Sequence, residues 1–129
     1  MSTIFSKIVQ GEIPAYIVAE NDRFLACLDV FPIAKGHTLV IPKKETNYIL
    51  DIEDEEFQAL WLFAKNVGKK VDRAITCERV GIAVIGLEVP HAHIHLVPIN
   101  GIGDINFANP KLKFSDEEMK AFQMAIIQA

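Results

Sequence analysis

The sequence predicts an α+β fold, in which an antiparallel sheet of about five strands packs against two main helices. Three observations predict this class. Three β-rich runs separated by turn residues lie within residues 16–42. A stripe of apolar side chains at helical spacing follows over residues 57–71. Two further β-rich runs and a capped helix complete the chain.

A short helix is predicted at the start of the chain, followed by a three-stranded meander. Thr3 can cap a helix from Ile4 to about Gln10, which Gly11 would end. The β-rich runs are YIVAE, RFLACLDV and HTLVIP, and the segments NDR and FPIAKG between them carry turn residues. We therefore expect three antiparallel strands that are neighbours in the sheet.

The clearest helix in the sequence follows the meander. Its apolar side chains recur every three or four residues and would form one stripe, made by Phe57, Leu60, Trp61, Ala64, Val67 and Val71. The acidic run EDEE at its start and the pair KK near its end match the helix dipole. A stripe of this kind more often packs in a core than binds a cofactor, so we interpret it as core.

The last third of the chain predicts two more strands and a final helix. The strands are RVGIAVIGLEV, residues 79–89, and HAHIHLVPI, residues 91–99, with Gly86 suited to a tight connection. The chain loosens after about residue 101. Ser115 and Glu118 then form an S-x-x-E capping box for a helix from about Asp116 to Gln128.

Composition predicts one compact domain over residues 1–129, because half of the 129 residues are apolar. The net charge of −4 excludes a general attraction to nucleic acid or to anionic membranes. Cys27 and Cys77 lie far apart and fit neither a disulfide framework nor a zinc finger, so we expect reduced thiols. The sequence shows no secretory leader and no apolar run of membrane-spanning length. We expect a cytoplasmic protein that binds neither membrane nor nucleic acid.

The segment VPHAHIHLVP holds three of the four histidines of the chain at a spacing of two residues. Side chains alternate between the faces of a strand, so His91, His93 and His95 would share one face. The apolar side chains between them would point into a core. Imidazoles two residues apart lie ~7 Å apart along a strand and can converge on one small ion or anion.

Three interpretations of this face compete. The cluster could be the polar face of an edge strand, although such faces usually carry Thr, Lys or Glu. It could bind a metal, because His-x-His in a strand is a common zinc-ligand spacing. It could also perform phosphoryl chemistry, because a neutral imidazole can attack phosphorus while its neighbours donate hydrogen bonds to the phosphate oxygens.

The surrounding sequence resembles the HIT (histidine triad) family. HAHIHLV is similar to the family motif H-φ-H-φ-H-φ-φ, in which φ is an apolar residue. Residues 4–44 are similar to the N-terminal half of the family nearly position by position, including GEIPA, LDVFP and GHTLVIPKK. The similarity covers most of residues 3–99. It implies a single HIT-like domain, with residues from about 101 to 129 as a C-terminal extension that covers the site or packs across a partner subunit.

The resemblance implies a role for each matching residue. His93 corresponds to the nucleophile, which attacks the α-phosphate of a nucleotide to give a nucleotidyl-histidine, and His95 to the histidine that contacts the phosphate. His91 and His37 correspond to supporting histidines that orient the nucleophile. Asp29 corresponds to the carboxylate that accepts hydrogen bonds from the ribose hydroxyls. The apolar wall for the base would be Val30, Phe5, Ile8 and Ile13.

The segment before the triad departs from the family pattern. Gly86 and Val89 still match, but the loop is shorter and Leu87 replaces a Gln. Glu88 stands where the family has a Ser near the phosphate, and it would either donate a proton to the leaving group or face solvent. A C-x-x-C that binds structural zinc in some relatives is TIFS here, so the resemblance implies no metal and no cofactor.

The similarity is strongest to the Hint-like branch, which implies a homodimeric nucleotide hydrolase. The third histidine, present here, favours hydrolysis over nucleotide transfer. The expected activity is a purine nucleoside phosphoramidase that releases a monophosphate of the AMP or GMP type. The alternatives are a dinucleoside polyphosphate hydrolase and a nucleotide-binding or scaffold protein with little catalysis.

Overall fold

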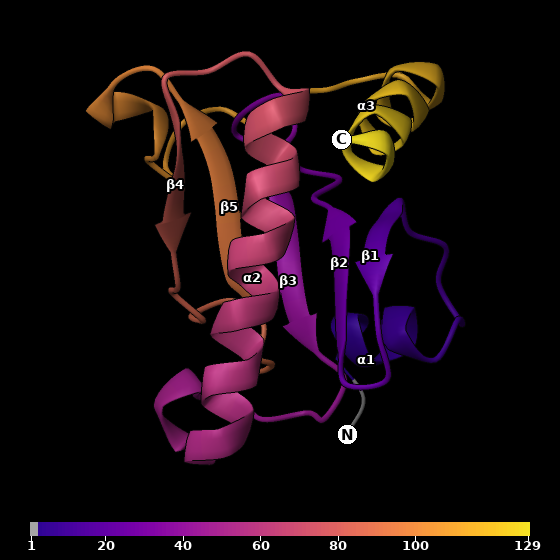
Figure 1. Ribbon diagram of the computed structural model, residues 1–129, viewed down its shortest axis with the longest axis vertical. Coiled ribbons are helices and arrows are strands. Elements are labelled where there is room, and N and C mark those ends of the chain that lie inside the picture. The colour runs from indigo at the N-terminus through magenta and orange to yellow at the C-terminus, as the bar shows by residue number, and fades with distance from the viewer. Residues whose placement is uncertain (1–2) are drawn as a thin grey trace.

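The computed structural model describes residues 3–129 and contains an antiparallel sheet in the strand order β1-β2-β3-β5-β4 (Figure 1). The strands are β1 (Ile17–Glu20), β2 (Phe24–Leu28), β3 (Thr38–Pro42), β4 (Arg79–Ala83) and β5 (Ile94–Ile99). The helices are α1 (Ile4–Val9), α2 (Asp54–Ala74) and α3 (Asp116–Gln128), with 3-10 turns at Ile49–Asp51 and Ile102–Asp104. The predicted α+β class is confirmed.

Strand β5 lies between β3 and β4, although β4 precedes it directly in the sequence (Figure 1). Its pairing with β3 sets Leu39 opposite His95 and Thr38 opposite Leu96. His37, the residue before β3, is thereby brought beside the histidine segment. This insertion joins the two parts of the chain that carry histidines.

The two faces of the sheet are covered differently. Helix α2 lies along one face (Figure 1), where its buried side chains Leu60, Ala64, Val67 and Val71 form the main core with apolar residues of the strands. The opposite face carries α1 and a smaller cluster, made by Phe5, Leu25, Cys27, Leu39 and Ile41. Ala92, Ile94 and Leu96 belong to the α2 side, so the histidines between them face the α1 side.

The local end signals act as predicted. The Thr3 side chain accepts a hydrogen bond from the amide of Ser6 at the start of α1, and Gly11 follows that helix with φ of 77°. The capping box of Ser115 and Glu118 is complete, and α3 covers residues 116–128. None of the helices within residues 3–129 has the length and apolar character needed to cross a membrane.

The two strands predicted in the last third are shorter than expected. Residues 84–93 form an extended loop, in which Gly86 has φ of 73°. The ladder between β4 and β5 ends where Ala83 pairs with His95, and the ladder between β3 and β5 ends one residue earlier in the sequence, where Val40 pairs with Ile94. His91 and His93 therefore precede β5, and the amide of Ala92 donates instead to the carbonyl of Thr46 at 2.7 Å.

The C-terminal residues pack against other parts of the same chain. Helix α3 packs against α2 and β1, with Met119 and Ile126 buried. Gln123 on this helix donates to the carbonyl of Ile17 at 2.9 Å. The segment that precedes the helix places the Phe107 ring against His37 and His95, with ring centroids 6.0 and 4.6 Å apart.

Candidate active site

All four histidines lie buried together on the α1 side of the sheet. The exposed fraction is 0% for His91, 2% for His37, 7% for His93 and 8% for His95. Since β5 is an interior strand and the rings are buried, the interpretation of the cluster as the polar face of an edge strand is wrong.

Hydrogen bonds to carbonyl groups define the tautomers of His91 and His93. Nε2 of His91 lies 2.8 Å from the carbonyl oxygen of Pro42, and Nδ1 of His93 lies 2.8 Å from that of His91. A carbonyl only accepts, so each of these nitrogens carries the proton. In the neutral ring of His93, Nε2 is therefore an unprotonated nitrogen with a free lone pair.

Aromatic edges pack around these rings. Phe5 of α1 meets His93 in a T-shaped contact with ring centroids 4.7 Å apart and meets His91 at 5.8 Å. The ring of His95 lies 4.8 Å from that of His93 and 4.6 Å from that of Phe107. These contacts limit rotation of the nucleophile candidate and exclude water from its sides.

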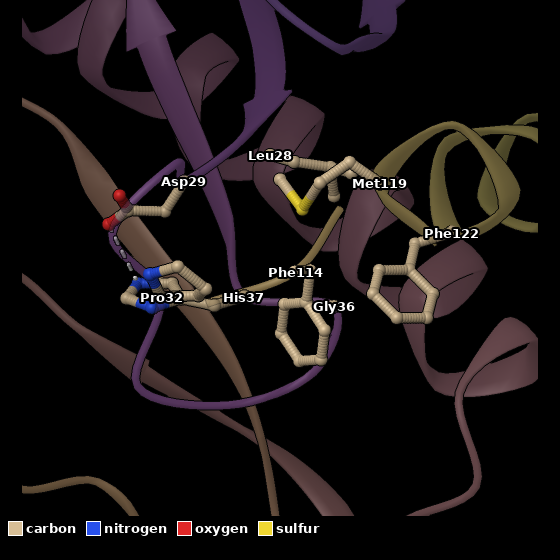
Figure 2. Close-up of a pocket in the computed structure, with 8 residues that line it drawn as sticks. All are labelled: Leu28, Asp29, Pro32, Gly36, His37, Phe114, Met119 and Phe122. Carbon is tan, nitrogen blue, oxygen red and sulfur yellow. Dashed lines mark ion pairs between the residues drawn. The ribbon is translucent and has the colours of Figure 1, made fainter. Parts of the chain in front are cut away.

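Asp29 lies at the end of β2 and faces His37 (Figure 2). Its Oδ1 accepts a hydrogen bond from the amide of Phe31 at 2.8 Å, and its Oδ2 is 3.6 Å from Nε2 of His37. The small cavity beside these two residues is closed by Phe114, Met119 and other side chains and has no room for a water molecule. It belongs to the core packing and is not a substrate site.

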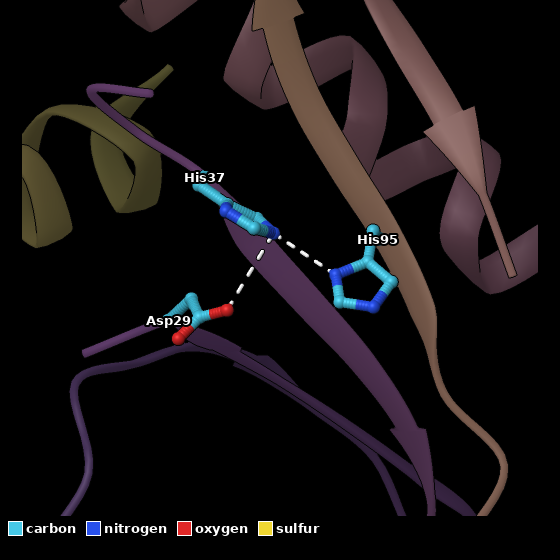
Figure 3. Close-up of side chains that lie close together, drawn as sticks. All are labelled: Asp29, His37 and His95. Carbon is cyan, nitrogen blue, oxygen red and sulfur yellow. Dashed lines mark hydrogen bonds and ion pairs between the residues drawn. The ribbon is translucent and has the colours of Figure 1, made fainter. Parts of the chain in front are cut away.

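His37 and His95 form a directed hydrogen-bond chain (Figure 3). The amide of Ile33 donates to Nδ1 of His37 at 3.2 Å, and Nε2 of His37 lies 3.0 Å from Nδ1 of His95. Because Nδ1 of His37 accepts, its Nε2 carries the proton and donates to His95. Nε2 of His95 then carries a proton as well and points away from His37, which makes it a neutral hydrogen-bond donor.

Burial keeps these imidazoles neutral. Desolvation is the main cause that lowers the pKa of His37 to about 4 and that of His95 to about 3. Burial also lowers the pKa of His93, although its hydrogen bond to the His91 carbonyl acts in the opposite direction. At neutral pH the site therefore offers one free imidazole nitrogen and neutral donors beside it.

Asp29, His37 and His95 lie close enough to be considered as metal ligands, since one atom from each falls within 4.8 Å of the others. The hydrogen bond from Ile33 opposes this use. It occupies Nδ1 of His37 as an acceptor, so the nitrogen that would bind the metal must hold a proton. The donor set does not fit a metal ion in this arrangement.

The residues predicted to line the base lie in two surroundings, the α1-side cluster and an open hollow. Val30 is 54% exposed and lines an open hollow of about 390 Å³ with Phe31, Lys111 and Lys113. Phe5 is buried against the histidines, and Ile8 packs beside the α1-side cluster. Ile13 is half-buried, and neither it nor Ile8 lines the hollow.

Two residues of the loop before the triad pack against buried clusters. Val84 packs against the main core, and Val89 packs against the α1-side cluster. Gly86 has open space around its α-carbon, and Leu87 is 89% exposed. Glu88 is exposed, and its negative charge acts on His93 as a minor influence that raises the pKa of that ring. Of the two alternatives for Glu88, a proton donor to the leaving group or a side chain that faces solvent, this arrangement corresponds to the second.

Sequence reasoning missed two groups of residues that surround the histidines. Phe107 and Lys111 come from the segment before α3, and the Lys111 ammonium donates to the Phe107 carbonyl at 3.1 Å. Thr3, Ser6 and Glu45 form hydrogen bonds around His91. No residue spacing in the sequence predicts that either group lies near the histidines, because each group depends on contacts between distant segments.

Comparison with known proteins gives a consistent result. Residues 10–101 match the HIT domain. An uncharacterised HIT-like protein of Mycoplasma genitalium is 40% identical over 102 residues, which cover 75% of this chain and 72% of that protein. The adenosine 5′-monophosphoramidase of Schizosaccharomyces pombe is 35% identical over 127 residues, or 94% of this chain and 92% of its own length.

A solved structure agrees with these relatives. The crystal structure of a HIT-like protein from Bartonella henselae has a TM-score of 0.86 at 26% identity and covers 98% of this chain and 95% of its own. The matched residues include β2, β3 and β5 and therefore all four histidines. The chain belongs to the HIT family.

Proposed function

We propose that this HIT-family protein is a nucleotide hydrolase that acts through a nucleotidyl intermediate on His93. The observation that carries the proposal is the hydrogen bond from Nδ1 of His93 to the His91 carbonyl. It leaves Nε2 with its lone pair free, and burial lowers the pKa of the ring so that it stays neutral and nucleophilic.

The proposed reaction has two displacements at phosphorus. Nε2 of His93 forms a bond to the α-phosphorus while the bond to the leaving group breaks, and a departing amine takes up a proton from water. A second water molecule then attacks phosphorus and gives its proton to the hydroxide left by the first step, the bond to His93 breaks, and the nucleoside monophosphate is released. In both steps the Nε2–H group of His95 would donate to a phosphate oxygen and stabilise charge in the transition state; the hydrogen bond from His37, which leaves this proton on Nε2, supports the role.

The proposed substrate is a purine nucleoside 5′-phosphoramidate. The S. pombe relative, which is named an adenosine 5′-monophosphoramidase and matches 94% of this chain, supports this choice. We further propose that Asp29 contacts the ribose and that Val30 borders the base, because both directly follow β2, Asp29 lies 3.6 Å from His37, and Val30 lines the open hollow.

Trapping of the intermediate tests the mechanism. Single-turnover incubation with adenosine 5′-phosphoramidate, followed by acid quench and intact-protein mass spectrometry, should detect an AMP adduct on the wild-type chain. His93→Ala should abolish it. Peptide mapping should place the adduct on residues 91–95. An adduct of undiminished yield in the His93→Ala variant would exclude His93 as the nucleophile.

One observation favours a second substrate class. Lys111 and Lys113 both line the open hollow beside Val30, where two cations would suit the additional phosphates of a dinucleoside polyphosphate. A substrate panel at equal concentration separates the two classes. A higher kcat/KM for diadenosine polyphosphates than for phosphoramidates, lost in a Lys111→Ala/Lys113→Ala variant, would reverse the order.

We also propose that the chain forms a homodimer through the open edge of β4. This strand ends the sheet, and Ile82 on it is 52% exposed, with Ile85 and Leu87 exposed in the loop that follows. Sedimentation equilibrium should give twice the chain mass, and Ile82→Lys should lower it. A wild-type monomer at the concentration of the activity assay would contradict this proposal.

A further inference from the structure

Three side chains outside the histidine motif form a hydrogen-bonded cluster around His91. Oγ1 of Thr3 lies 2.9 Å from Nδ1 of His91, and Oγ of Ser6 lies 3.1 Å from the Thr3 oxygen. The Ser6 hydroxyl donates to the carboxylate of Glu45. Thr3, Ser6 and His91 are each at most 8% exposed, whereas Glu45 is exposed, so the cluster meets solvent only at its Glu45 end.

The direction of each hydrogen bond in this cluster follows from its neighbours. Nε2 of His91 carries the proton that the Pro42 carbonyl accepts, so Nδ1 of the neutral ring is an acceptor. The proton of Ser6 is committed to Glu45, which as a carboxylate only accepts. The Thr3 hydroxyl is therefore the donor to His91, while its oxygen accepts the amide of Ser6 at 3.0 Å.

The same histidine supplies the carbonyl that orients the nucleophile. Nδ1 of His93 donates to the His91 carbonyl, so any shift of His91 moves the acceptor that holds the His93 tautomer. His91 itself lies in a loop and not in a strand. Its ring contacts Thr3 and Pro42, and its amide donates to the Val89 carbonyl at 2.8 Å, so ring and backbone contacts together restrain its position.

We propose that Thr3 is a positioning residue for the nucleophile: its hydroxyl holds the tautomer and location of His91, and through the His91 carbonyl it keeps Nε2 of His93 unprotonated and aimed at phosphorus. Ser6 and Glu45 support Thr3 by removing a competing donor. This proposal rests on the proposed function of His93. It extends the catalytic arrangement to the first turn of α1, 88 residues away in the sequence.

Thr3→Val is the central test, because it removes the hydroxyl and keeps the branched side chain. Burst-phase formation of the AMP adduct should slow roughly tenfold, which corresponds to about one hydrogen bond. KM should change less than about twofold, because Thr3 does not contact the substrate in this scheme. Thr3→Ser keeps the donor and should restore most of the rate.

Thr38→Val is the matched control. Thr38 is as buried as Thr3 and its hydroxyl donates to the Gly36 carbonyl, but it alternates with His37 and faces the α2 side of the sheet. Its loss tests whether any missing buried hydroxyl slows the reaction. An equal slowing in both valine variants would overturn the positioning role of Thr3.

A spectroscopic measurement separates this inference from the proposed function. In protein labelled with ¹⁵N-histidine, the ring signals should identify His91 and His93 as rings with one protonated nitrogen each, Nε2–H and Nδ1–H. In Thr3→Val the His91 pattern should change, and His93 should populate both tautomers. Unchanged ring signals would overturn the inference even if the wild-type chain formed no adduct.

The wild-type spectrum is decisive by itself if Thr3→Val fails to fold. A proton on Nδ1 of His91 in the neutral ring would make Thr3 an acceptor and overturn the proposal. Absence of an AMP adduct in the wild type, with the expected tautomers present, would instead contradict the proposed function and leave the hydrogen-bond chain supported.

Discussion

The hydrogen-bond chain through His37 predicts that two substitutions of this residue lower the stability of the protein by similar amounts but lower its activity by different amounts. His37→Asn places an amide oxygen near the position of Nδ1, so it can still accept from Ile33, but it removes the donor to His95. His37→Gln reaches the position of Nε2 and can keep that donor, while the Ile33 amide loses its acceptor.

The expected losses follow from the two hydrogen bonds, of 3.2 and 3.0 Å, made by a side chain that is 2% exposed. A buried polar group left without its partner costs about 1–3 kcal/mol, so both variants should lose a similar free energy of unfolding. Only His37→Asn removes the donor that keeps the proton of His95 on Nε2. Loss of one oriented donor to the transition state costs up to about 10²–10³ in kcat, so we expect about 10- to 100-fold for Asn and less than about threefold for Gln.

The assay combines urea denaturation with steady-state hydrolysis of adenosine 5′-phosphoramidate, at a temperature where both variants are folded. Circular dichroism at that temperature is the control for folding. Equal loss of activity in the two variants would refute the directed chain, because the rate would then follow stability and not the donor to His95. Wild-type activity in His37→Asn would refute it as well.

Three further predictions concern stability and the cover of the site. The two paired histidines have a folded pKa of about 4 and about 3, below their usual value, so the unfolded chain binds more protons as the pH falls from about 6.5. The free energy of unfolding should be full above that pH and fall by on the order of 5 kcal/mol by about pH 4.5; a flat profile in urea titrations would contradict the buried neutral rings. Gly36→Ala should lower the free energy of unfolding by about 2–4 kcal/mol, because φ is +82° and the new Cβ would lie 2.6 Å from Ile75. Gly86→Ala, which has open space around the new Cβ, should lower it by only about 1 kcal/mol. Equal losses in the two variants would argue against this clash. Phe107→Ala should raise the pKa of His95 in NMR titrations by uncovering the ring, and Phe107→Leu should raise it less; an unmoved pKa would show that the aromatic cover is not what desolvates it.

The elements that the sequence predicts most accurately have signals within one or two helical turns. The caps at Thr3 and Ser115 and the apolar stripe of α2 are all confirmed, because the interacting residues lie three or four positions apart. The two strands predicted within residues 79–99 are longer than the strands in the structure. β-propensity shows where a strand can form, but the ladder ends where the partner strand ends, at the pairing of Ala83 with His95.

The predictions for the site divide in the same way, into those that rest on local patterns and those that depend on packing between distant segments. The motif and its flanking segments identify the four histidines, and alternation correctly predicts that the triad faces away from the main core even though His91 and His93 precede the strand. The base wall stays a prediction: Phe5 and Ile8 pack in the α1-side cluster, and Val30 lines the open hollow. Contacts within such a wall depend on how loops pack, which no local pattern encodes.

The residues alone thus establish the fold class, the helix ends and the presence of imidazoles on one face. Tertiary structure decides which nitrogen of His37, His91 and His95 is free, whereas His93 takes its partner, the His91 carbonyl, from within the motif. The Ile33 amide assigns the proton of His37, and the Pro42 carbonyl, 49 positions away, assigns that of His91. The insertion of β5 beside β3 brings His37 to His95 across 58 positions. A tautomer is fixed by its hydrogen-bond partners, so it exists as a property of the folded chain and not of the motif.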